Sequence, residues 1–267
     1  MDSRDSLSRQ IRRSILVQSK RANVGHIGSA LSVVDLLAAL YGDVLEVRLA
    51  TDPERDRFVL SKGHAALALY STLNAIGRLS DSELESFCVD GSPLATHPEH
   101  IVLSVDFSTG SLGMGLSLAV GSALAARIQR SPRRTFVLLS DAECNEGSVW
   151  EAVMFAAHHG LGNVIALVDV NGQQALGYTR EVLDLDPLSR RWKAFGWAVH
   201  EVDGHDVDAL TLTLTELAAL PAKPHVLLAQ TTFGKGVSYM ENTIAWHYLP
   251  MSDEQFAQAM NEVQGGP

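Results

Sequence analysis

The sequence predicts an α/β fold, in which a doubly wound, mainly parallel sheet is flanked by helices on both faces. Four short apolar runs rich in β-forming residues alternate with segments of helical pattern, and such alternation is typical of a parallel sheet. The four runs are residues 135–139, 164–168, 198–202 and 225–230. Because the runs are almost uniformly apolar, we expect helices to cover both faces of each strand.

The first third of the chain is predicted to be mostly helical. Residues 6–21 place Leu7, Ile11 and Ile15 at helical spacing. Further helices are expected over residues 32–40 and 64–76, and a short one should start at a capping box formed by Ser80 and Glu83. The sequence contains no internal repeat, low-complexity tract or linker, so we expect one α/β domain over residues 1–267.

Composition excludes several classes of function. Hydrophobic residues make up 46% and charged residues 19%, which is enough apolar material for a packed core. The net charge of −10 and the lack of a basic stripe argue against nucleic acid as a partner. No apolar segment is long enough to span a membrane, and no secretory signal is evident. The two cysteines, Cys88 and Cys144, are too few for a disulfide framework, so a cytoplasmic location is expected.

Polar residues follow two of the predicted strands where an open parallel sheet binds its ligands, beyond the carboxyl ends. Asp141 follows the strand that ends at Leu139, and Asn171 follows the next strand. With a backbone carbonyl near Gln173, they offer three oxygen ligands and leave room for phosphate oxygens on an octahedral Mg²⁺ ion. A structural interpretation stays open, in which Asp141 caps a helix starting near Gly147 and Asn171 only turns the chain.

Several motifs together resemble one enzyme family. The Asp141 segment and the Asn171-Gly172 pair thirty residues later resemble the thiamine diphosphate motif of transketolases. Other segments resemble transketolase signatures in order and spacing, and they comprise residues 25–29, 61–65, 97–99, 108–113, 146–151, 203–206 and 240–247. The resemblance runs from about residue 25 to 250 and covers the N-terminal, pyrophosphate-binding domain, as in split bacterial transketolases.

The resemblance implies roles for individual residues. Asp141 and Asn171 would bind Mg²⁺ through their side chains, and Gln173 through its carbonyl. Backbone groups of Gly110 and Leu112 would hold the aminopyrimidine of the cofactor, and Glu146 would join a proton relay at the subunit interface. The diphosphate and the sugar channel would be lined by four histidines: His26, His64, His97 and His247.

Histidines suit this chemistry because ketol transfer moves protons near neutral pH, where imidazole can both accept and donate them. The cofactor serves as the electron sink, so the protein supplies orientation, hydrogen bonds and proton transfer. The other six histidines are predicted to be structural or surface residues. His205, in the turn at residues 203–206, is expected to stabilise a loop.

Several positions depart from the family pattern, and the family's His-Pro-Gly-Gly appears here as His26-Ile27-Gly28-Ser29. Ser140 and Ala142 replace the glycines that usually flank the metal-binding aspartate, and the Cβ of Ala142 faces the diphosphate, which requires a negative φ. Met114 replaces a usual His or Gln, and Tyr248 replaces a glycine and would narrow the channel. These changes keep the cofactor class but put the usual sugar-phosphate substrates in doubt.

The resemblance therefore predicts one subunit of a transketolase-like transferase that uses thiamine diphosphate and Mg²⁺. It would move a two-carbon ketol unit from a ketose, phosphorylated or not, to an aldehyde. The carboxylate that activates the cofactor lies on the family's pyrimidine-binding domain, so a C-terminal partner subunit is expected, in an α2β2 assembly. Two alternatives stay open: a ligase or lyase using a 2-oxo acid or a specialised-metabolite precursor, and a non-catalytic scaffold subunit.

Overall fold

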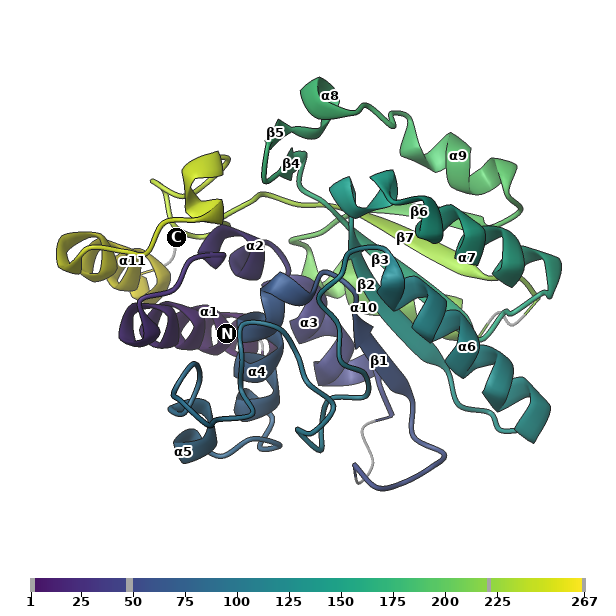
Figure 1. The fold of residues 1–267 in the computed structure, drawn as a ribbon, viewed down its shortest axis with the longest axis horizontal. Helices are drawn as coiled ribbons and strands as arrows, with labels where there is room; N and C mark the ends of the chain where they lie inside the picture. Colours follow the sequence, from purple (N-terminus) through teal and green to yellow (C-terminus); the bar gives the residue numbers. More distant parts are fainter. Residues whose placement is uncertain (1–2, 47–49, 220–221, 266–267) are drawn as a thin grey trace.

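A computed structural model describes residues 3–46, 50–219 and 222–265. A parallel sheet of five strands in the order β1-β2-β3-β7-β6 runs through the molecule (Figure 1). The strands are β1 (Arg57–Leu60), β2 (Thr135–Ser140), β3 (Val164–Val170), β6 (Ala198–Asp203) and β7 (His225–Gln230). The four predicted strands are confirmed, three of them one or two residues longer than expected. Strand β1 was not predicted.

The N-terminal third is helical around strand β1. The first predicted helix is α1 (Ser3–Ala22). The second begins earlier than expected and is broken at Val33, and the third starts as a 3₁₀ turn. These elements are α2 (Ile27–Ser32), α3 (Val34–Ala39), the π-helical η1 (Leu40–Val44), the 3₁₀ helix η2 (Gly63–Ala65) and α4 (Ala66–Ala75). Helix α5 (Asp81–Leu84) begins with the predicted capping box of Ser80 and Glu83.

The remaining helices connect the strands or follow the last one. Between β1 and β6 lie α6 (Met114–Gln129), the 3₁₀ helix η3 (Ala142–Asn145), α7 (Gly147–His158), α8 (Thr179–Val182) and α9 (Leu188–Ala194), and a small hairpin of β4 (Gln173–Gln174) and β5 (Gly177–Tyr178). Later come α10 (Val207–Ala218), the 3₁₀ helix η4 (Ile244–His247) and α11 (Asp253–Gly265). Figure 1 shows α6 and α7 on one side of the sheet.

Two hydrophobic cores lie on opposite faces of the sheet. Phe136 and Leu138 of β2 point into the core that also contains residues of α1, α3, α4 and α10. Val137 and Leu139 point into the second core, with residues of α6, α7 and α9. Consecutive side chains of a strand point to opposite faces, so an apolar strand needs a helical layer on each side. The predicted doubly wound sheet is confirmed.

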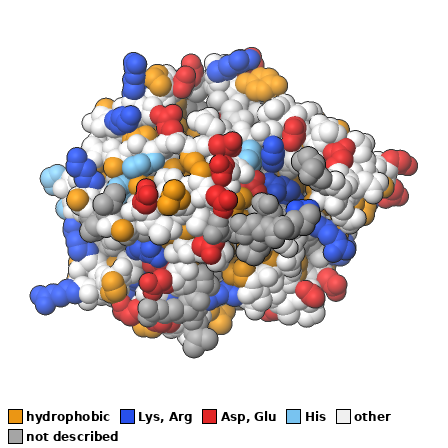
Figure 2. Space-filling model, turned by 180° about the vertical axis from the view of Figure 1, so that it is seen from behind, with side chains coloured by type: hydrophobic (Ala, Val, Ile, Leu, Met, Phe, Trp, Pro, Cys, Tyr) orange, Lys and Arg blue, Asp and Glu red, His pale blue; other side chains and the backbone are white. Residues whose placement is uncertain are grey.

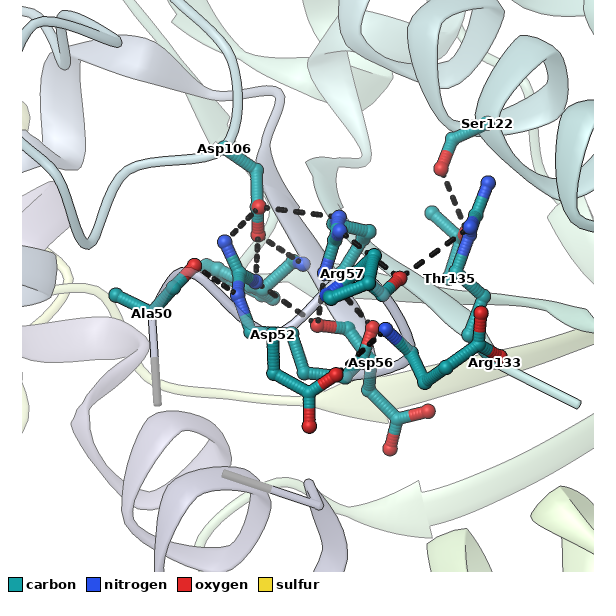
Figure 3. Close-up of polar contacts among 12 residues, drawn as sticks. Ala50, Asp52, Asp56, Arg57, Asp106, Ser122, Arg133 and Thr135 are labelled. Atoms are coloured by element: carbon teal, nitrogen blue, oxygen red, sulfur yellow. Dashed lines mark hydrogen bonds and ion pairs between the residues drawn. The ribbon is translucent and has the colours of Figure 1, made fainter. Parts of the chain in front are cut away.

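At the amino end of β1 and β2, arginines and aspartates form a cluster (Figure 3). Arg55 donates to both carboxylate oxygens of Asp106, at 2.6 and 3.1 Å. Arg134 pairs with Asp56 through its guanidinium, and its backbone N–H donates to Asp56 Oδ1 at 2.9 Å. Arg57 adds a second cation 3.5 Å from Asp106. We call these five residues the arginine–aspartate cluster.

Charged side chains of both signs share the face of the molecule drawn in Figure 2 and are interspersed there. No helix within the described ranges is long and apolar enough to cross a membrane. Cys88 is exposed and Cys144 is buried, and both are free thiols.

Candidate cofactor site

The carboxyl ends of β2 and β3 bring two predicted metal ligands together. The strands pair in parallel with Ser140 opposite Asp169, so Asp141 and Asn171 each follow their strand at the same edge. The Asp141 backbone N–H donates to the Asp169 carbonyl at 3.1 Å, which extends the ladder to this edge. The side chains of Asp141 and Asn171 are both buried. The register of the two parallel strands thus brings the side-chain oxygens of Asp141 and Asn171 to the same edge of the sheet.

Among the described residues, no cationic side chain pairs with the carboxylate of Asp141. One of its oxygens accepts the backbone N–H of Ala142 and the other accepts that of Gly172, each at 2.8 Å. Burial, and next the negative charge of Asp169, raise the pKa of Asp141 to about 7. A bound cation would favour the ionised form and remove this penalty. The carboxylate is therefore well suited to a metal ion.

Asn171 and Gln173 complete the predicted metal-binding set. Asn171 Nδ2 donates to Asp169 Oδ2 at 2.8 Å, which fixes the amide so that Oδ1 points away from Asp169 and accepts the Gln173 N–H at 2.9 Å. The side-chain oxygen of Gln173 is buried and has no hydrogen-bond partner in the part of the chain that the structure describes. In the described residues, no three His, Cys, Asp or Glu side chains form a metal cluster. A site with one carboxylate fits Mg²⁺, which keeps waters and takes ligands from phosphates.

A buried ion pair lies behind these ligands. Lys62 and Asp169 are 1% and 0% exposed and pair directly. The hydroxyls of Ser32 and Thr231 also donate to Asp169, the former at 2.8 Å. Together with Asn171, four side chains thus satisfy one carboxylate. Sequence reasoning missed Lys62 and Asp169 as site residues, although Asp169 directly follows a predicted strand.

Three of the four predicted histidines form a compact group. The ring centroids of His26, His64 and His247 lie 5.2–5.4 Å from one another. His26 precedes α2 with a φ of 60°, and its backbone N–H donates to the His247 carbonyl at 3.2 Å. The ring of Phe233 lies parallel to that of His247, with centroids 6.1 Å apart. Segments more than 200 residues apart in sequence therefore build this group.

All three histidines are held neutral. Burial is the main cause that lowers the pKa of each ring, to about 4 for His247. The charge of Lys62 and the neighbouring histidines lower the pKa values further. His26 Nδ1 is buried without a hydrogen-bond partner. A neutral imidazole with a free nitrogen can accept a proton from a bound hydroxyl group.

His97 lies beside this group, in contact with the loop of Gly110. A Cβ placed on Gly110 would lie 3.3 Å from the His97 ring, so this glycine allows close packing. The charge of His97 also lowers the pKa of His26 and His64. The His97 carbonyl accepts the hydroxyl of Tyr70 at 3.1 Å, which anchors the loop to α4. All four predicted histidines thus meet at one edge of the sheet.

The loop that contains Gly110 and Leu112 is held by a buried carboxyl group. Glu143 accepts the hydroxyl of Ser61 and the backbone N–H of Gly113, the latter at 2.8 Å. Burial raises the pKa of Glu143 above its usual value. Leu112 is partly buried beside this anchor. Glu143 was not predicted, and its connection to a loop thirty residues away is visible only in the fold.

Glu146 lies at the rim of this edge. Its side chain is exposed, and a Cβ on Gly113 would lie 2.7 Å from the Glu146 Cβ, so the two backbones are adjacent. Helix α7 starts at Gly147 as expected, but its N-cap is Glu146. Asp141 instead accepts the N–H of Ala142 at the start of η3, so the capping role considered for Asp141 at Gly147 is wrong.

Comparison with known proteins identifies the family. Residues 4–265 match the family model described as "Transketolase, thiamine diphosphate binding domain". The chain is 41% identical to one of the subunits of the apulose-4-phosphate transketolase of Phocaeicola vulgatus over 245 residues, 91% of this chain and 87% of that protein. The chain belongs to the transketolase family. Its length corresponds to the separate subunits of this family, because it also covers 94% of the 6-deoxy-6-sulfo-D-fructose transketolase subunit SqwG of Clostridium sp., at 37% identity over 95% of this chain.

Solved transketolases share the fold. The enzyme from Leishmania mexicana superposes with a TM-score of 0.90 at 30% identity, over 99% of this chain and 42% of that one. The enzyme from Campylobacter jejuni gives a TM-score of 0.88 at 29% identity, over 98% of this chain and 42% of that one. The chain thus spans less than half of these transketolases and corresponds to their thiamine diphosphate-binding domain.

The positions that depart from the transketolase pattern are compatible with this site. Ala142 does not have a positive φ, so its Cβ causes no backbone strain. Met114 is 49% exposed at the start of α6. The Tyr248 ring lies 5.1 Å from the His247 ring, and its hydroxyl donates to the Ala175 carbonyl at 2.8 Å. Tyr248 thus sits beside the histidine group, where its side chain remains largely exposed.

Proposed function

We propose that this chain is the thiamine diphosphate-binding subunit of a two-chain transketolase that moves a two-carbon ketol unit from a ketose to an aldehyde. One observation carries the proposal: three partly buried histidines with lowered pKa values, His97 beside them and the buried carboxylate of Asp141 meet at the same carboxyl edge of the sheet. Family membership makes thiamine diphosphate the expected cofactor of that edge.

Asp141 and Asn171 would hold Mg²⁺ through their side chains, and Gln173 through its carbonyl. The raised pKa of Asp141 and the fixed orientation of the Asn171 amide support these roles. Phosphate oxygens and water would complete the octahedral shell. His64 and His247 would bind the diphosphate, while the backbone of Gly110 and Leu112 would bind the aminopyrimidine.

Bound thiamine diphosphate supplies a nucleophilic carbon and an electron sink, and the protein positions the sugar and moves protons. The neutral rings of His26, His64 and His247 would accept a proton from the donor hydroxyl that becomes the aldehyde product, and would give a proton to the carbonyl oxygen of the acceptor aldehyde as it becomes a hydroxyl. His97, which lies beside this group, would line the same channel. Burial that lowers the pKa of these rings supports the role, because a ring that is already protonated cannot act as a base.

A C-terminal, pyrimidine-binding partner subunit would complete the site. Two features of this edge support such a partner: Glu146 is exposed at the rim, and large apolar side chains nearby are open to solvent. Leu176, Leu183 and Leu249 are 81%, 55% and 50% exposed. Exposed apolar surface of this kind is typical of an interface. We infer an assembly of two copies of each chain, with Glu146 joining a proton relay across the contact.

The substrates are inferred at the level of their class. Two relatives of subunit length are named for apulose 4-phosphate and 6-deoxy-6-sulfo-D-fructose, which are ketoses that carry an anionic group. We propose a ketose of this general kind as donor. In this proposal the partner subunit supplies the residues that bind the anionic group.

The test is an assay of this chain co-expressed with a candidate partner subunit. Ketol transfer from phosphorylated and unphosphorylated ketoses is measured with and without thiamine diphosphate and Mg²⁺, and each chain alone serves as the control. Transfer should need both chains and both cofactors and should disappear in Asp141→Ala. Turnover of a 2-oxo acid but of no ketose would instead identify a ligase or lyase, and failure to bind the cofactor would identify a scaffold subunit.

A further inference from the structure

A second cavity lies away from the cofactor site, between α1, α3, α11 and the loops that follow β6 and β7. Its volume is about 350 Å³, and its polar lining includes Ser8, Arg9, Arg12, Asp35, His205 and Lys235. None of the histidines or metal ligands described above lines it. The volume is in the range of small-molecule sites.

The acidic groups of this cavity already have hydrogen-bond partners. Asp35 pairs with the guanidinium of Arg12, and Asp35 Oδ2 lies 2.8 Å from His205 Nδ1. His205 Nε2 accepts the backbone N–H of Thr232 at 2.8 Å, so the ring proton is on Nδ1 and faces Asp35. His205 thus stabilises a loop, as predicted from sequence. The other acid, Glu262, accepts the N–H and hydroxyl of Ser238 at 2.6 and 2.7 Å.

Two cationic side chains of the cavity, in contrast, have no partner among the described residues. Within the part of the chain that the structure describes, the side chains of Arg9 and Lys235 form no hydrogen bond or ion pair, although both are partly buried. The hydroxyl of Ser8, 3% exposed, and Nε of Arg12 are buried without a partner. Gly236, with a φ of 91°, leaves space for Arg12, because a Cβ there would lie 3.3 Å from Arg12 Cδ. Unpaired buried donors need an explanation in a native structure.

We propose that this cavity binds a small metabolite through a phosphate or carboxylate group. Arg12 and Asp35 cancel each other, and Arg9 and Lys235 outnumber the remaining carboxylate, Glu262, so the lining keeps one net positive charge. Ser8 supplies a hydroxyl donor. Guanidinium and ammonium groups bind such oxyanions by charge-assisted hydrogen bonds, which are stronger than neutral ones. The net charge of the whole chain is −10, so the positive character is local to the cavity and not a property of the entire surface.

The test is calorimetric titration of the full chain with inorganic phosphate and, separately, with malonate. We expect saturable binding of at least one anion, weakened at least tenfold in the double variant Arg9→Gln/Lys235→Gln. The matched control is Arg13→Gln/Lys193→Gln, which removes two exposed charges elsewhere and should leave binding unchanged. Ser8→Ala should weaken binding several-fold at unchanged charge. Preference for phosphate or for malonate identifies the group that the natural ligand carries.

A further variant separates this site from the cofactor site. Phosphate could instead bind at the diphosphate site. Binding that is lost in His64→Ala but kept in Arg9→Gln/Lys235→Gln would show this and would overturn the proposal. Equal weakening in the cavity variant and in the surface control, or no binding of either anion, would also overturn it. Thermal unfolding of each variant confirms that the fold is retained.

Discussion

The two ends of the same strands carry polar clusters of opposite character. At the amino end, Asp56 and Asp106 each receive a guanidinium group and a backbone N–H, so the arginine–aspartate cluster is saturated (Figure 3). At the carboxyl end, no described residue gives Asp141 a cationic partner or His26 Nδ1 a hydrogen bond. A cluster in which every polar group has a partner stabilises the fold. A cluster with unpaired polar groups can bind a ligand.

The largest loss of stability is expected from Lys62→Met. Although the carboxyl end has unpaired groups, it also contains the fully buried ion pair of Lys62 and Asp169. Removal of Lys62 leaves Asp169 buried without its cation, and breaking a buried pair costs about 3–5 kcal/mol. Urea unfolding measures the loss. The double variant Lys62→Met/Asp169→Asn should recover most of it because no charge remains unpaired. A loss below about 1 kcal/mol for the single variant would show that the pair is not structural.

A smaller effect is expected from Arg134→Met at the amino end. Asp56 keeps its backbone N–H donor but loses the guanidinium, which should cost about 1–3 kcal/mol of unfolding free energy. Cofactor affinity should not change. Arg180→Met, which removes a largely exposed arginine, is the control and should shift stability by less than about 0.5 kcal/mol. Weaker cofactor binding in Arg134→Met would contradict the proposal that the amino end stabilises the fold while the carboxyl end binds the cofactor.

Ala142→Gly should change little, although it restores a residue usual in the family. Ala142 has no positive φ, so glycine relieves no strain and should cost up to about 1 kcal/mol by added backbone freedom. Thiamine diphosphate affinity, measured by calorimetry in the presence of Mg²⁺, should be unchanged. A tenfold gain in affinity would show that the Cβ obstructs the diphosphate.

The smallest expected effect is a pH dependence from His247. Its folded-state pKa of about 4 lies below the ordinary value of 6.5, so the unfolded chain binds more protons between these values. Its contribution to stability is therefore complete above pH 6.5 and is lost as pH falls towards 4. Urea unfolding at several pH values should show that the unfolding free energy of His247→Gln depends less steeply on pH than that of the unchanged protein. Ring-proton titration by NMR should give the low pKa directly. A pKa near 6.5 would contradict a buried, neutral ring.

Much of the fold was predictable from sequence because apolar runs of five or more residues specify buried strands. Strand β1 was missed because it has four residues, begins with Arg57 and follows a charged segment. Asp141 and Asn171 were identified because they lie two and three residues beyond the ends of predicted strands and match the thiamine diphosphate motif. Lys62 and Glu143 were not identified as site residues. Lys62 pairs with Asp169, 107 residues away, and Glu143 with Ser61, 82 residues away, and only the parallel register of the strands brings these partners together.

The most direct test of the contrast compares Asp141→Asn with Asp56→Asn, one carboxylate from each end of the sheet. Unfolding free energy and Mg²⁺-dependent binding of thiamine diphosphate are measured for both, with the partner subunit present in the binding assay. Asp141→Asn should leave stability within about 1 kcal/mol, because relief of charge burial offsets a lost hydrogen bond, and should abolish binding. Asp56→Asn should lower stability by about 1–3 kcal/mol and leave binding intact. Intact cofactor binding in Asp141→Asn would contradict the account.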